Sequence, residues 1–86
     1  MQLPGQEQKE LQSALIDAFP NTASLEQMLS FELDKNIRAI AGEGSLQDII
    51  FKLIQTANSQ GWVENLICAA YNHKPGNENL QSIIQK

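Results

Sequence analysis

The chain has 86 residues, with ten acidic and six basic side chains and a net charge of −4. A domain of this size buries only roughly two thirds of the surface that its unfolded chain exposes, which argues against a deep enzyme cleft. An acidic surface repels nucleic-acid phosphates unless basic groups cluster, and no apolar run approaches the ~18–20 residues of a membrane span. We therefore expect a soluble domain that binds neither nucleic acid nor membrane.

The first part of the chain contains two helical patterns separated by Pro20. From residue 6 onward, apolar side chains recur at spacings of three and four, which predicts a helix that ends before this proline. Beyond it, the side chain of Asn21, Thr22 or Ser24 can cap a second helix by accepting a backbone N–H bond. The predicted buried residues of the two helices are Leu11, Ala14, Leu15, Ala18, Leu25, Met28, Leu29 and Leu33.

A short third helix is predicted in the stretch KNIRAIA. Asp34 stands directly before this stretch and is positioned to cap the helix. Ile37 and Ile40 are its buried residues, and Gly42 ends it. The third helix is therefore expected to be little more than a connection between longer ones.

The fourth helix has the longest apolar stripe in the chain, formed by Leu46, Ile49, Ile50, Leu53, Ile54 and Ala57. At its start, Ser45 with Asp48 three residues later resembles a capping box. Phe51 lies off the stripe, because at about 100° per residue it points more than a quarter-turn away from the stripe's centre. We expect this helix at the centre of the protein, with Phe51 buried against the first or the last helix.

A fifth and a sixth helix follow in quick succession. Gly61 is predicted to end the fourth helix in a left-handed conformation, and the fifth begins almost at once. Pro75 and Gly76 break the fifth helix, after which Asn77 can cap a short last one. The predicted buried residues of these two helices are Val63, Leu66, Ile67, Ala70, Leu80, Ile83 and Ile84.

These patterns predict an all-α fold in one domain over residues 1–86. Strand signals are weak, and helices this short are marginal in isolation, so they must pack together. We expect a compact bundle of five to six helices, at about residues 6–18, 23–32, 35–41, 46–59, 62–73 and 78–85.

The residue types that carry chemistry are scarce. Cys68 and His73 are the only cysteine and histidine, and on one helix they diverge by roughly 140°, so they cannot act as a catalytic pair. Cys68 is expected to be a small buried or half-buried side chain. One cysteine and one histidine are too few for a structural zinc site. We expect no catalysis, metal or cofactor and, since the N-terminus does not resemble a signal peptide, a cytoplasmic protein.

Several short motifs occur in a characteristic order: Phe19-Pro20, LEQML at 25–29, LDKNI at 33–37, LQDIIFKLI at 46–54, ANSQGWVENLI at 57–67, and Pro75-Gly76-Asn77. In order and spacing they resemble the bacterial effector-associated domain of the death-like superfamily. The resemblance covers about residues 6–84 and implies a six-helix death-like bundle without a shared catalytic residue. The family pattern also has an apolar residue at the place of Phe51, which favours its burial.

The resemblance implies an adaptor that recruits or couples effectors, such as proteases or signalling NTPases, in bacterial immunity or programmed cell death. The expected partner is the same or a related death-like domain on an effector or sensor protein, which allows a homo-oligomer. Because nearly all the negative charge precedes Ile50, we expect a contact between unlike faces of two domains. The candidates are Glu26, Glu32 and Asp34 on one face, and Lys35, Arg38, Lys52 and Lys74 on the other.

Two alternatives stay open. The first is a small helical DNA-binding domain of the helix-turn-helix kind, which would need arginine or lysine on the exposed face of one helix. The second is a regulatory subunit that occludes the active site of an enzyme, for which the sequence would look the same.

Overall fold

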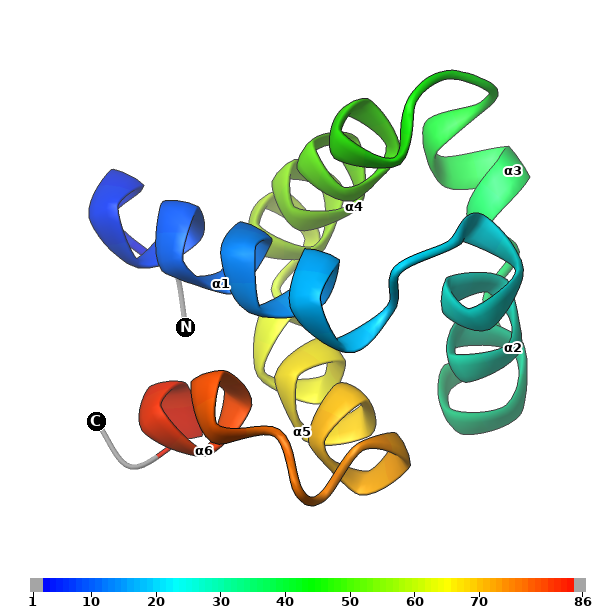
Figure 1. Cartoon of the computed structure of the whole chain (residues 1–86). Helices are drawn as coiled ribbons and strands as arrows, with labels where there is room; N and C mark the ends of the chain where they lie inside the picture. The colour runs from blue at the N-terminus through cyan, green and yellow to red at the C-terminus, as the bar shows by residue number, and fades with distance from the viewer. Residues whose placement is uncertain (1–2, 85–86) are drawn as a thin grey trace.

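The computed structural model describes residues 3–84, which contain six helices and no strand (Figure 1). The all-α bundle expected from the sequence is therefore confirmed. Its radius of gyration is 11.4 Å, close to the about 12 Å of a compact chain of this length. The helices are α1 (Gly5–Ala18), α2 (Thr22–Leu33), α3 (Ile37–Ala41), α4 (Leu46–Gln60), α5 (Val63–His73) and α6 (Glu78–Ile84).

The centre of the bundle is α4, which packs against α1, α3 and α5. Its apolar stripe is buried from Ile49 to Ala57, as the spacing predicts. Figure 1 shows α2 and α3 on one side of the bundle and α6 next to α1 on the other. The core runs from Leu3 to Leu80 and takes residues from all six helices, so one hydrophobic cluster holds the described chain together.

Three predicted helix caps are confirmed. The side chain of Asn21 accepts the Ser24 N–H at 2.8 Å, and Ser45 Oγ accepts the Asp48 N–H at 3.2 Å. Asn77 Oδ1 accepts the Leu80 N–H at 3.0 Å and so caps α6. Each of these bonds satisfies a backbone donor that the helix itself leaves unpaired.

The prediction that Asp34 caps α3 is wrong. Asp34 instead closes α2 in a left-handed conformation, with φ 54° and ψ 42°. The cap of α3 is Asn36, whose Oδ1 accepts the Arg38 N–H at 2.9 Å. Because the turn occupies residues 34–36, α3 begins at Ile37 instead of residue 35.

The start of α1 has no side-chain cap, because Pro4 occupies the capping position. The preceding residue is held by α4 instead: Asn58 Oδ1 accepts the Leu3 N–H at 2.7 Å, and Asn58 Nδ2 donates to the Leu3 carbonyl at 3.3 Å. Gln8 Nε2 donates to the same carbonyl at 2.8 Å. A side chain 55 residues away thus holds the chain just before α1 in place, although it caps no N–H of the helix itself.

The burial predicted for Phe51 is wrong, since 52% of its surface is exposed. It does lie beside α1, but the residues that face it there include the polar Gln8 and Gln12, which cover it only in part. The last helix, α6, packs against α1 and α5 instead.

Cys68 is also exposed, contrary to the expectation of a buried or half-buried side chain. On α5 it shares the outer face with Glu64 and Asn72, each four residues away and also exposed. The buried positions of α5 are Val63, Leu66, Ile67, Ala69 and Ala70.

Candidate interaction surface

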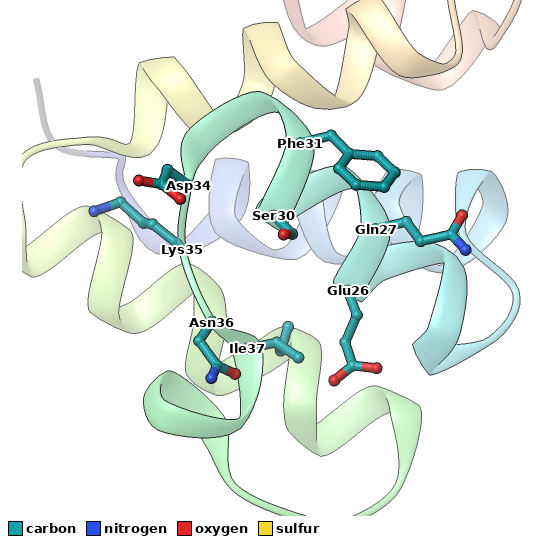
Figure 2. A pocket seen from close by; sticks show the side chains of 8 residues that line it. All are labelled: Glu26, Gln27, Ser30, Phe31, Asp34, Lys35, Asn36 and Ile37. Carbon is teal, nitrogen blue, oxygen red and sulfur yellow. The ribbon is translucent and has the colours of Figure 1, made fainter.

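The surface beside α2 and α3 carries a depression of about 400 Å³ (Figure 2). The last two turns of α2 form one wall, and the linker with the start of α3 forms the other. We call this feature the α2–α3 depression. Its lining residues are Glu26, Gln27, Ser30, Phe31, Asp34, Lys35, Asn36 and Ile37.

Phe31 is the most exposed large hydrophobic residue in the part of the chain that the structure describes, with 76% of its surface accessible. Figure 2 shows its ring standing away from the α2 ribbon, next to Gln27. The sequence reasoning singled out Phe51 and missed Phe31. The signal was present, because the helical neighbours of Phe31 at i−4 and i+3 are the polar residues Gln27 and Asp34.

Glu26, which lines the depression, forms an ion pair with Arg38 of α3. Glu26 Oε1 lies 3.3 Å from Arg38 Nε, and 37% and 75% of the two side chains are exposed, respectively. An exposed pair of this kind stabilises the fold by less than about 1 kcal/mol. The ion pair matters more for the predicted contact between two molecules. Glu26 and Arg38 were expected on opposite faces of that contact, but within one molecule they partly neutralise each other's charge.

Asp34 and Lys35 make up the turn between α2 and α3. The Lys35 N–H donates to the Leu29 carbonyl at 3.1 Å, which fixes the chain as it leaves α2. Lys35 Nζ lies 4.6 Å from the centre of the Trp62 ring, in a cation–π contact. Trp62 is itself held by its Nε1–H, which donates to Gln60 Oε1 at 2.9 Å. The lysine is therefore directed toward the α4–α5 junction.

The structure brings together four of the seven charged candidates: Glu26, Asp34, Lys35 and Arg38 all lie at or beside the α2–α3 depression. The other three are dispersed. Glu32 is exposed near the end of α2, Lys52 is exposed on α4, and Lys74 follows the last residue of α5. The contact between an acidic and a basic face of two molecules remains a prediction. Four of the seven residues proposed for it lie on a single surface.

The basic residues do not form a stripe along any helix of the described chain. Arg38 is paired with Glu26, Lys35 lies over Trp62, and Lys52 is the only basic residue of α4. Phosphate binding needs several such groups acting together. This arrangement therefore gives no support to a nucleic-acid interface.

Residues 3–84 contain neither a cluster of metal-binding side chains nor a membrane-spanning helix. No group of three or more His, Cys, Asp and Glu side chains could hold a metal ion there. None of the helices in that range combines the length and the apolar character that crossing a bilayer requires.

Comparison with known proteins identifies the family. Neither a curated protein nor a solved structure matches the chain significantly. The family model of effector-associated domain 1 matches residues 1–86. An effector-associated domain is an accessory domain that associates with effector proteins rather than a catalytic unit. The chain belongs to the effector-associated domain 1 family.

Proposed function

We propose that this protein is a non-catalytic adaptor that couples effector proteins by pairing with a like domain. The observation that carries the proposal is the exposed ring of Phe31 beside a cluster of charged side chains at the α2–α3 depression. Aromatic residues surrounded by polar ones are typical anchors of protein–protein contacts. The family match supports the association with effectors.

The partner is a second copy of this domain or a related one on an effector or sensor protein. The effectors are proteases or signalling NTPases of bacterial immunity or programmed cell death, as the resemblance to death-like domains implies. The domain acts in the cytoplasm, where reducing conditions suit the free, exposed thiol of Cys68.

Self-association of the purified chain tests the proposal. Cys68 is the single cysteine and is exposed, so it accepts one fluorescent label on the outer face of α5. Sedimentation velocity of labelled chain, titrated with unlabelled chain up to about 1 mM, should show a species larger than the monomer that grows with concentration. A Cys68→Ser variant, followed by absorbance, controls for an effect of the label. A chain that stays monomeric over the whole range would overturn like-to-like pairing.

A further inference from the structure

Two large hydrophobic side chains are exposed in the described chain, and their surroundings differ. Phe31 stands away from α2 (Figure 2), with 76% of its surface accessible. Phe51 is 52% exposed and forms part of the wall of a hollow between α1 and α4. Both rings border a hollow, but Phe31 is the more exposed and stands out from its helix, while Phe51 is half covered in the wall of its recess.

The recess, which we call the α1–α4 groove, has a volume of about 230 Å³ and a largely apolar lining. This is smaller than the roughly 300–1,000 Å³ of small-molecule sites, and it suits a single inserted side chain better than a cofactor. Gln8 and Gln55 line it and are joined by a hydrogen bond of 2.8 Å. At its N-terminal end is Gly5, where an added Cβ would meet no atom within 4 Å.

The α1–α4 groove and the α2–α3 depression each carry a charged side chain without an ion pair in the described chain, and these two charges have opposite signs. Lys9 is the one charged residue that lines the α1–α4 groove, and it has no ion pair within residues 3–84. At the α2–α3 depression, the Glu26 carboxylate is engaged by Arg38 and the Lys35 ammonium lies over Trp62. Asp34 remains there as a carboxylate without an ion pair in the described chain.

From these observations, we propose that Phe31 of one copy inserts into the α1–α4 groove of a second copy and packs against Phe51, with Asp34 directed toward Lys9. The inference rests on the proposed like-to-like pairing and adds which two surfaces meet. The occupant is a second copy because this chain itself carries both complementary parts, an exposed ring next to a carboxylate and a recess next to an ammonium.

The contact joins unlike surfaces, so each bound copy still offers one free groove and one free Phe31. In Figure 1 the N-terminal half of α1 and the α2 helix lie at opposite sides of the bundle, so both surfaces can be occupied at once. Such a head-to-tail contact repeats into an open chain of domains unless its rotation closes a ring.

Two variants, each blocking one surface, provide the test. Phe31→Ser removes the projecting ring from an exposed position, and Gly5→Leu adds a bulky side chain at the edge of the groove, where the chain leaves open space, to obstruct an incoming ring. Each variant alone should self-associate at least about tenfold more weakly than the parent. Mixed together, they should form a 1:1 pair through their intact surfaces and grow no further in sedimentation velocity.

Matched controls separate these effects from misfolding. Gly5→Ala adds only the Cβ, which leaves the groove open, and Asn65→Ala truncates an exposed side chain on α5, so both should associate like the parent. Thermal melting followed by circular dichroism should show that all four variants are folded.

The outcomes distinguish this inference from the proposed function. If the parent associates and Phe31→Ser and Gly5→Leu associate equally well, the two surfaces are assigned wrongly while like-to-like pairing stands. If Phe31→Ser fails but Gly5→Leu assembles like the parent, Phe31 takes part in the contact but meets a surface other than the groove, and the inference is wrong. A parent that never associates overturns the pairing itself.

Discussion

Among single residues, Asp34 has the most unusual backbone, because it is the one non-glycine residue with positive φ in the described chain. The left-handed conformation costs an ordinary L-residue roughly 1–2 kcal/mol, and glycine almost nothing. We therefore expect Asp34→Ala to be less stable than Asp34→Gly by about 1 kcal/mol in urea-induced unfolding. Equal free energies of unfolding for the two variants would contradict the left-handed turn.

The same turn shows where sequence reasoning fails at the residue scale. Asp34 and Asn36 both have side chains that can cap helices, and only one residue separates them. Which one acts as the cap depends on where α2 ends, and no proline or glycine marks that end. At Asn21, Ser45 and Asn77 a neighbouring proline or glycine fixes the break, and there the predicted caps are correct.

Helical spacing likewise shows which side chains lie outside the apolar stripe of a helix. It does not show whether a neighbouring helix covers them. Phe51 and Cys68 were both expected to be covered, yet both are exposed. Phe31 is off the stripe of α2 in the same way. An aromatic residue off a stripe is thus an ambiguous signal for an interaction site, because its exposure depends on tertiary packing.

Among the elements, α1 depends on α4 for its start. Asn58 both accepts the Leu3 N–H and donates to the Leu3 carbonyl. A net contribution of about 0.5–1.5 kcal/mol for each hydrogen bond predicts that Asn58→Ala lowers the free energy of unfolding by about 1–3 kcal/mol. Asn58→Asp keeps the acceptor and loses the donor, so it should lie between the parent and the alanine variant. Unchanged unfolding of Asn58→Ala would show that these bonds do not hold the start of α1.

Helix number and most buried positions were predictable because prolines and glycines mark most of the helix ends. Leu33, Ile40 and Ile83, which were expected to be buried, are only half-buried at the edge of the core. The helices against which α6 packs could not be predicted from the sequence. α6 is held to α1 by polar contacts, in which Asp17 Oδ2 accepts from Asn77 Nδ2 at 2.9 Å and from Asn79 Nδ2 at 3.3 Å. These partners lie 60 and 62 residues apart, and nothing in the local pattern of α6 indicates its direction.

For the whole molecule, the balance between apolar and charged contacts decides how copies would associate. The sequence suggested that several charges act together, but the Glu26–Arg38 pair and the Lys35–Trp62 contact already engage three of the candidates internally. Four of the seven candidates are then left to act between molecules, three of them dispersed over the surface, and each exposed pair contributes less than about 1 kcal/mol. Phe31 should therefore contribute more to association than any one of these charges.

Salt dependence measures this balance. Raising the salt from about 0.1 M to about 1 M shortens the Debye length from roughly 10 Å to 3 Å and screens exposed pairs. We expect the self-association constant of the parent to fall, but by less than about tenfold, because one or two exposed pairs are lost. Asp34→Asn, which removes the carboxylate and keeps a side chain that tolerates the left-handed turn, should bind more weakly at low salt and respond less to added salt. Sedimentation velocity at both salt concentrations gives the self-association constants of the parent and of Asp34→Asn.

An unchanged self-association constant of the parent would exclude a role for charge. A fall far beyond tenfold would show that charged groups, and not the ring of Phe31, dominate the contact.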